Sequence, residues 1–126
     1  MSVTSGGAPK LVVCLSNQTA DETLGPWIDV QGYTNHTFYV TGVGTVSSGV
    51  VSFEEASPII DAMNAPVVGE ATGGYSVIQT CTAADVTGGA QKAYHSPPNA
   101  TYHSIRARIS TAIGGGGNVS VTLVAS

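Results

Sequence analysis

Short runs of β-branched and aromatic residues, repeatedly interrupted by turn-forming clusters, constrain this chain more than any other feature. Runs rich in Val, Ile, Thr and aromatic residues alternate with clusters of Gly, Pro, Asn and Ser along the whole sequence. This spacing is typical of strands joined by turns, and it predicts an all-β fold. Eight short strands suit a single antiparallel β-sandwich with a jelly-roll-like organisation. The expected strands are residues 10–15, 27–30, 36–41, 49–54, 75–82, 92–95, 103–110 and 118–125.

The clearest alternation lies at the C-terminus. Ile105, Ala107 and Ile109 fall on one face of a strand, and the two arginines between them fall on the other. After four glycines, the segment 118–125 alternates in the same way. Period-two alternation with one apolar face places a strand between core and solvent. The matched patterns across a glycine turn predict that these two strands pair as a hairpin.

The length of 126 residues fits one domain with its own core. We expect an N-terminal arm over residues 1–9 and the sandwich over residues 10–126. Helix is scarce, because the only helix-like segment, residues 57–65, is short and is followed by Pro66, which favours a single turn or an irregular loop. The connection 57–74 is the longest without strand character, and it is therefore the first candidate for a functional loop.

The chain carries few charges for its size. Only 10% of its residues are charged, compared with about a quarter in an ordinary soluble domain. Repulsion between like-charged copies normally keeps monomers apart, so this composition favours packing against copies or partners. A net charge of −4 with four basic residues lacks the positive patch that phosphate binding requires, and nucleic acid is not an expected partner.

The sequence shows no signal for secretion or membrane insertion. The opening MSVTSGGAP has neither the basic nor the apolar region of a signal peptide, and no apolar run reaches a membrane span of about 18 residues. We therefore expect synthesis in a cytoplasm, with Cys14 and Cys81 as buried, unbonded thiols.

Four of the five asparagines begin Asn-x-Ser/Thr triplets, at Asn17, Asn35, Asn99 and Asn118. Such triplets are glycan acceptors in secreted proteins, but they are also turn chemistry. Without a secretory signal, we interpret them as polar corners between strands.

Two alternative binding modules follow from the aromatic and cysteine pattern. Cys14, Trp27 and Cys81 have the approximate order of the immunoglobulin core, but Gln79 occupies the position of the expected tyrosine. The aromatic residues could instead form a stacking platform for sugars, although a sandwich core explains most of them. The rings of such a platform would be Trp27, Tyr33, Phe38, Tyr39, Tyr75, Tyr94 and Tyr102.

No catalytic or metal-binding motif is recognisable. His36, His95 and His103 lack the spacing of ligands on one element, and they are expected at the surface or in turns. Glu54 and Glu55 are adjacent on a strand, so their side chains point to opposite faces and make a poor acid–base pair. We therefore expect no enzyme activity, no cofactor, no metal and no small-molecule substrate.

Three segments resemble small β-sandwich structural proteins of tailed bacteriophages: WIDVQGYTNHTFYVT (27–41), GVVSFEEAS (49–57) and HSIRARISTAIGGGGNVSVTLVAS (103–126). The resemblance implies an auxiliary virion protein that is made in the host bacterial cytoplasm. Its expected role is decoration (cement) of the capsid exterior, with a tail, neck or fibre subunit as the alternative. Its implied partners are the major capsid protein and further copies of itself in a homotrimer or homodimer, with no membrane partner. Residues 1–10 and the 57–74 loop are the expected contact elements, specifically Val3, Pro9, Lys10, Ile59, Ile60 and Met63.

Overall fold

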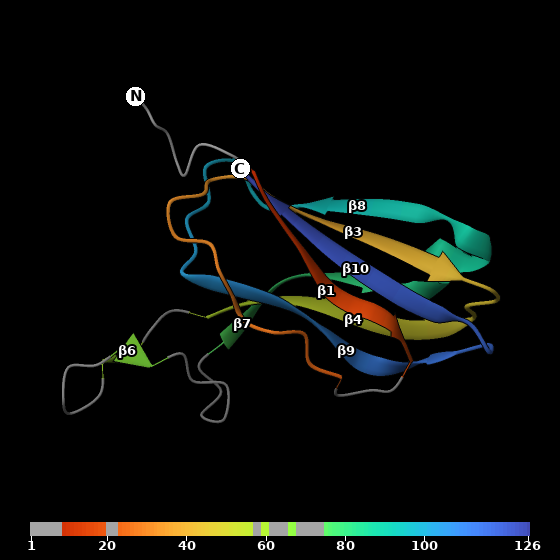
Figure 1. Ribbon diagram of the computed structural model, residues 1–126. Coiled ribbons are helices and arrows are strands. Elements are labelled where there is room, and N and C mark those ends of the chain that lie inside the picture. Colours follow the sequence, from red (N-terminus) through yellow and green to blue (C-terminus); the bar gives the residue numbers. More distant parts are fainter. Residues whose placement is uncertain (1–8, 20–22, 57–58, 61–65, 68–74) are drawn as a thin grey trace.

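The computed structural model describes residues 9–19, 23–56, 59–60, 66–67 and 75–126. All eight expected strands are present, and two short strands are added in the 57–74 connection (Figure 1). The elements are β1 (Lys10–Gln18), β2 (Ile28–Asp29), β3 (His36–Val43), β4 (Ser48–Ala56), β5 (Ile59–Ile60), β6 (Pro66–Val67), β7 (Tyr75–Thr82), the 3-10 segment η1 (Ala83–Gly89), β8 (Gln91–His95), β9 (Ser104–Gly114) and β10 (Asn118–Ala125).

Two four-stranded antiparallel sheets pack face to face. Sheet A has the order β1-β10-β3-β8, and sheet B has the order β2-β9-β4-β7. The two sheets together contain eight strands, which leaves out β5 and β6. When these eight are renumbered 1 to 8 in chain order, the strand orders are 1-8-3-6 and 2-7-4-5, which is the arrangement of a jelly roll. The predicted fold class is thereby confirmed. Among the described residues, β5 and β6 pair with each other as a small separate ribbon.

The predicted hairpin between the last two strands is wrong. β9 lies in sheet B between β2 and β4, whereas β10 lies in sheet A between β1 and β3. Their matched alternation has another cause, because both strands direct one apolar face into the same core from opposite sides. Alternation shows that a strand has one buried face, but it does not show which sheet the strand joins.

The four glycines after Ile113 therefore cross between the sheets. They pack against the β3–β4 connection, which also passes from one sheet to the other, and Gly117 donates its N–H to the carbonyl of Thr45 at 2.8 Å. Gly115 and Gly116 adopt positive φ angles of 103° and 89°. A Cβ on Gly117 would meet the carbonyl oxygen of Val43 at 2.3 Å. This crossing requires glycine both for backbone conformation and for close approach.

The core forms between the inner faces of the two sheets. Phe38 of sheet A stacks on Phe53 of sheet B, with ring centroids 4.3 Å apart, and Tyr94 packs against Phe53 at 5.3 Å. These rings bridge the two layers, so sheet packing and aromatic contact stabilise each other. The fully buried aliphatic residues around them include Val30, Val40, Val51, Ile105, Ile109, Val119, Val121 and Leu123.

The asparagine triplets mark corners and strand beginnings. Asn17 and Asn99 have positive φ angles of 52° and 60°, as turn and bulge positions require. Asn17 lies in an irregular part of the β1–β10 pairing, Asn35 immediately precedes β3, and Asn118 begins β10. The interpretation of these triplets as turn chemistry fits their positions.

Candidate functional site

The predicted contact residues lie toward one end of the sandwich, so far as the structure describes them. Pro9 is exposed, and Lys10 begins β1. Ile59 and Ile60 form β5, whose ribbon with β6 extends beyond the same end (Figure 1). Val3 and Met63 lie outside the described residues, as does almost all of the predicted arm. The predicted contact surface and the domain boundary at residue 9 therefore stay predictions.

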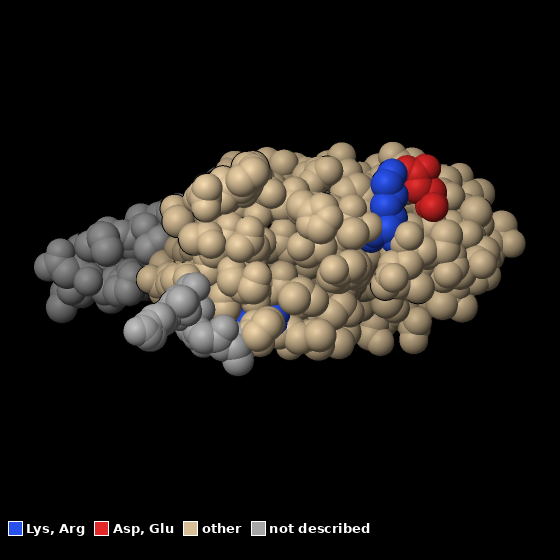
Figure 2. All heavy atoms as spheres, turned by 90° about the horizontal axis from the view of Figure 1, so that it is seen from above, with Lys and Arg blue, Asp and Glu red and all other residues tan. Residues whose placement is uncertain are grey.

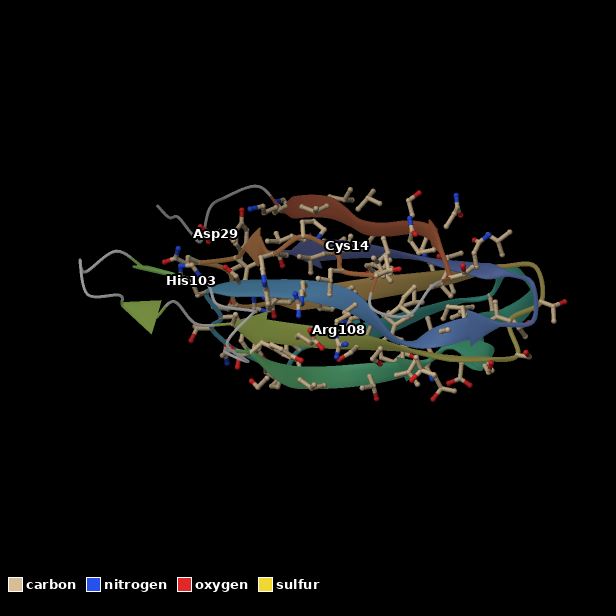
Figure 3. All side chains as sticks on the ribbon, turned by 90° about the horizontal axis from the view of Figure 1, so that it is seen from below. Cys14, Asp29, His103 and Arg108 are labelled. Atoms are coloured by element: carbon tan, nitrogen blue, oxygen red, sulfur yellow. The ribbon has the colours of Figure 1, made fainter. Side chains whose placement is uncertain are left out.

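Lys10 hydrogen-bonds to the sandwich at this end. Its Nζ donates to the backbone carbonyl of Asp29 at 2.7 Å. The Asp29 carboxylate accepts the backbone N–H of Gln31 at 2.9 Å, and this bond, aided by the charges of His103 and Lys10, lowers the pKa of Asp29. Asp29 and His103 lie close together at this end in Figure 3. The end of the sandwich thus carries both signs of charge.

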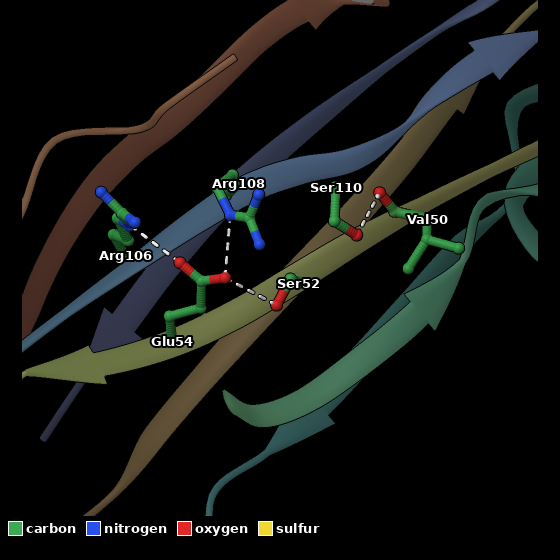
Figure 4. A network of polar contacts seen from close by, with 6 residues as sticks. All are labelled: Val50, Ser52, Glu54, Arg106, Arg108 and Ser110. Carbon is green, nitrogen blue, oxygen red and sulfur yellow. Dashed lines mark hydrogen bonds and ion pairs between the residues drawn. The ribbon is translucent and has the colours of Figure 1, made fainter. Parts of the chain in front are cut away.

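A buried ionic cluster on the outer face of sheet B was not foreseen from the sequence. The Glu54 carboxylate is fully buried, and its two oxygens accept from Arg106 Nε and Arg108 Nε, each at 2.9 Å (Figure 4). Ser52 donates its hydroxyl to the oxygen shared with Arg108, at 3.0 Å. We name these four residues the Glu54 cluster.

Strand register places the Glu54 cluster together. Within the β4–β9 pair, Glu54 lies directly opposite Arg106, and Ser52 lies directly opposite Arg108. In antiparallel strands, residues two apart share a face, so Ser-x-Glu on β4 matches Arg-x-Arg on β9. A slip of one residue would break every contact in the cluster. The cluster can therefore fix the register of these two strands.

Aromatic rings cover the guanidinium groups. The Trp27 ring centroid lies 4.3 Å from Cζ of Arg106, and the Tyr75 centroid lies 5.1 Å from the same atom. Tyr75 also lies 5.9 Å from Cζ of Arg108. Arg106 is 2% exposed, so these cation–π contacts are partly desolvated, which strengthens them. Trp27 is therefore an outer-face residue and not the core tryptophan of an immunoglobulin domain.

A sequence signal for the cluster was present. The alternation placed Arg106 and Arg108 on the face opposite Ile105, Ala107 and Ile109, and that face was expected to meet solvent. The sequence shows Glu54 beside Glu55, whereas its partners in the fold lie on a distant strand. The Ser-x-Glu and Arg-x-Arg spacings are complementary, but only the pairing of β4 with β9 makes that visible.

The outer face of the four strands of sheet A, in contrast to that of sheet B, carries no formally charged side chains. Its outward residues on all four strands include no Asp, Glu, Lys or Arg. Figure 2 looks down on this side, where the coloured atoms are mainly a basic–acidic group near one edge. Lys92 and Asp85 form a half-exposed pair at 3.3 Å. We name the outward residues of sheet A the neutral face: Leu11, Val13, Thr37, Tyr39, Thr41, Val43, Gln91, Ala93, His95, Asn118, Ser120, Thr122 and Val124.

A shallow open hollow of about 330 Å³ lies on the neutral face. The hollow forms because the outward residues of the central strand β10 are short there, whereas those of its neighbours are longer. Ser120 and Thr122 lie between Leu11 of β1 and Tyr39 of β3, and Thr41, Gln91 and Val124 complete the lining. The hollow offers hydroxyl, amide and aliphatic groups but no charge.

Among the described residues, the aromatic rings are divided between the core and the two outer faces. Phe38 and Tyr94 lie in the core, Trp27 and Tyr75 cover arginines on sheet B, and Tyr39 faces outward from sheet A. A broad stacking platform for sugars would need several rings on one face.

The two cysteines are buried and unbonded, as predicted. They lie on β1 and β7, which are edge strands in different sheets. Burial raises the pKa of the Cys14 thiol to about 12 and also raises the pKa of Cys81. Both thiols are thus held in the neutral, unreactive form at neutral pH.

The histidines are only partly where they were expected. His95 is exposed and His103 is half-buried, but His36 lies in the interior at 2% exposed, against the expectation of a surface position. It heads β3 on the inward register, its Nδ1 lies 3.0 Å from the Ser96 hydroxyl, and it packs on Tyr102. Burial lowers the pKa of His36. Within the described ranges, no group of three or more His, Cys, Asp or Glu side chains could hold a metal ion.

The part of the chain that the structure describes contains no helix with the length and apolar character needed to cross a membrane.

No protein-family model matches the chain, and no curated protein matches it significantly in sequence. Among solved structures, the SPBc2 prophage-derived protein YomS is similar over 99% of this chain and 97% of its own, with a TM-score of 0.50 and 12% identity. The K3 cleaved adhesin domain of Lys-gingipain from Porphyromonas gingivalis W83 gives a TM-score of 0.40 and 16% identity over 92% of this chain and 70% of its own. At 12% identity, the likeness to YomS establishes a shared β-sandwich fold.

Proposed function

We propose that this chain is a non-enzymatic structural subunit of a bacteriophage particle, and specifically a decoration protein that binds the outer shell of the head and stabilises it. The observation that carries the proposal is the distribution of charge. Arg106 and Arg108, half of the basic residues, are used inside the Glu54 cluster, while sheet A presents a face without formal charge. A surface of this kind favours repeated packing, because it has little charge repulsion to overcome.

The shell contact in this proposal is the end of the sandwich that carries Pro9, Lys10 and the β5–β6 ribbon. An oligomer that touches several shell subunits at once gains avidity and links them together, so it raises particle stability without chemistry. The resemblance of three segments to phage structural proteins supports the same role, and a prophage-derived protein shares the fold. The proposed partners are the major capsid protein and further copies of this chain.

Copy number tests the proposal directly. Quantitative mass spectrometry of the purified particle would compare this chain with the major capsid protein, and electron cryo-microscopy would locate it. Decoration predicts a copy number near that of the shell protein, distributed over the head. A count of about a dozen or fewer at one vertex would instead identify a tail, neck or fibre subunit, and absence from the particle would overturn the virion role.

Deletion of residues 1–9 tests the proposed arm. The truncated protein should retain the sandwich, which begins at β1, but it should bind particles more weakly than the full chain does. Co-sedimentation with undecorated heads measures this binding, and far-UV circular dichroism controls for folding. Unchanged binding would show that residues 1–9 make no shell contact.

A further inference from the structure

We infer that the neutral face is a self-association surface, on which a second copy of this chain packs about a twofold axis. This inference deepens the proposed assembly role by naming the contact between copies, and it rests on that role for its biological meaning. Three features of the neutral face support a twofold contact: the distribution of its exposed aliphatic residues, its shape and its size.

Exposed aliphatic residues are concentrated on this face. Leu11 is 68% exposed, Val13 is 58% exposed, and Val43 is 51% exposed, so three of the five large hydrophobic residues that are exposed in the described part of the chain belong to it. They are separated by hydroxyl and amide side chains and not by charges. Interface cores are likewise poor in charged residues, and burying such a face requires no ion to be desolvated.

The shape of the face suits a twofold contact. Leu11 and Val13 follow one another along β1 at one edge, and the hollow over Ser120 and Thr122 lies beside them. A twofold interface brings the same patch of both copies together, so a ridge in one copy must meet a depression in the other. With the axis between ridge and hollow, the β1 ridge of each copy covers the hydroxyl floor of its partner. The hollows of both copies are then filled.

The size of the face reaches the lower limit for a specific interface. Four strands spaced about 4.8 Å apart and about eight residues long, at about 3.4 Å per residue, cover roughly 500 Å² per copy. A pair would bury roughly 1,000 Å², which is about the smallest area of a specific protein–protein interface. We therefore expect a weak, concentration-dependent dimer that becomes significant when a particle surface holds copies close together.

A matched pair of substitutions tests this surface. Val13→Glu places a carboxylate on the neutral face, where the partner copy would bury it against its uncharged hollow. Val77→Glu makes the same change at a similarly exposed residue (53%) on β7 of sheet B. Analytical ultracentrifugation of the wild type at about 0.1 mM should show a monomer–dimer equilibrium with a dissociation constant on the order of 10 to 100 μM. Val13→Glu should weaken it at least tenfold, and Val77→Glu should leave it unchanged.

A second pair tests the hollow without adding charge. Thr122→Trp fills the hollow and should also abolish the dimer, whereas Thr80→Trp on the exposed side of β7 should not. Thermal unfolding of all four variants confirms that each is folded. A wild type that stays monomeric at this concentration, that forms a trimer, or that loses its dimer equally with both members of a pair would overturn the inference. Titration with neutral oligosaccharides that perturbs Thr122 and Tyr39 resonances of a monomeric wild type would also overturn it, in favour of a glycan site.

The outcomes separate this inference from the proposed function. A monomeric protein that still covers the phage head would overturn the self-association surface alone. A twofold dimer that is absent from every particle would overturn the virion role alone.

Discussion

The outer faces of the two sheets use polarity in opposite ways. On sheet B, Glu54, Arg106 and Arg108 form a buried ionic cluster beneath aromatic rings, in which one carboxylate binds both guanidinium groups. On sheet A, the outward hydroxyl and amide groups hydrogen-bond in part to one another, as Gln91 does to Thr41, and the exposed aliphatic groups are left to solvent or a partner. A buried charge network specifies one strand pairing, whereas a neutral face imposes no electrostatic condition on what packs against it. The first face serves the fold, and the second is available for assembly.

The largest effect is expected from removing the shared carboxylate of sheet B. Glu54→Gln leaves two guanidinium groups without the negative charge that both contact, and breaking a buried ion pair in this way costs about 3–5 kcal/mol. Since domains of this kind are stable by only about 5–15 kcal/mol, the variant should lose most of its stability. Urea unfolding followed by Trp27 fluorescence measures the change.

The neighbouring glutamate provides the control for this substitution. Glu55 is half-exposed and accepts a hydrogen bond from the Ser76 hydroxyl, so Glu55→Gln should cost no more than about 1 kcal/mol. If the two substitutions had equal effects, the Glu54 cluster would not have the special role assigned to it.

The next largest loss of stability is expected at the glycine connection between β9 and β10. Gly117→Ala directs a methyl group at the Val43 carbonyl, 2.3 Å away, and overpacking of this kind costs about 1–3 kcal/mol. The adjacent Gly116 has open space around it but a positive φ, so Gly116→Ala should cost only about 1 kcal/mol of backbone strain. Thermal unfolding of the two variants compares the stability cost of the steric clash at Gly117 with the cost of the strained backbone at Gly116. A larger loss for Gly116→Ala would contradict the packed crossing.

The fold could be predicted from the sequence to the level of strands and class. Alternation depends on burial, which is a local property of each strand, and all eight strands were found for that reason. Their pairing depends on contacts between distant segments. Thus the last two strands were expected to form a hairpin, although in a jelly roll each of the successive strands β8, β9 and β10 lies in the sheet opposite to the one before it. Glycines that serve a tight hairpin and glycines that cross between sheets look the same in the sequence.

The functional surfaces were less predictable for the same reason. Arg106 and Arg108 were expected to meet solvent, because their burial depends on Glu54, which lies 52 and 54 residues earlier in the chain. His36 was expected at the surface or in a turn, because its spacing from the other histidines fits no metal site, but its burial depends on contacts with the distant Ser96 and Tyr102. The neutral face was implied by the low charge of the chain, but its location required the order of the strands. A composition describes the whole surface, whereas a binding face depends on which strands lie together.

A smaller effect is expected from uncovering the Glu54 cluster. Trp27→Ala removes the ring that lies over Arg106, with a loss of about 1–2 kcal/mol from the cation–π contact and the packing around it. Trp27→Phe keeps an aromatic face and should recover about half of that loss. Because Trp27 is the only tryptophan, these variants need circular dichroism as the unfolding probe. Equal stability of Trp27→Ala and the wild type would mean that the ring does not contribute to the cluster.

The smallest effect concerns pH and the inner side of sheet A. Burial lowers the pKa of His36, so below about pH 6.5, the ordinary histidine value, the unfolded chain binds more protons than the folded protein does. Stability should therefore fall as the pH is lowered from 8 to 5. His36→Phe keeps a ring against Tyr102 but cannot be protonated, so its stability should change less over this range. His95→Gln, on the exposed neutral face, should retain the wild-type dependence.

Asp29 does not contribute to this pH range. Its pKa is lowered, and a lowered carboxyl pKa affects stability only near and below the ordinary value of about 4. Between pH 5 and 8, the difference between the His36 and His95 variants therefore reports the buried histidine. An unchanged pH dependence in His36→Phe would show that protonation of His36 does not cause the loss of stability at low pH.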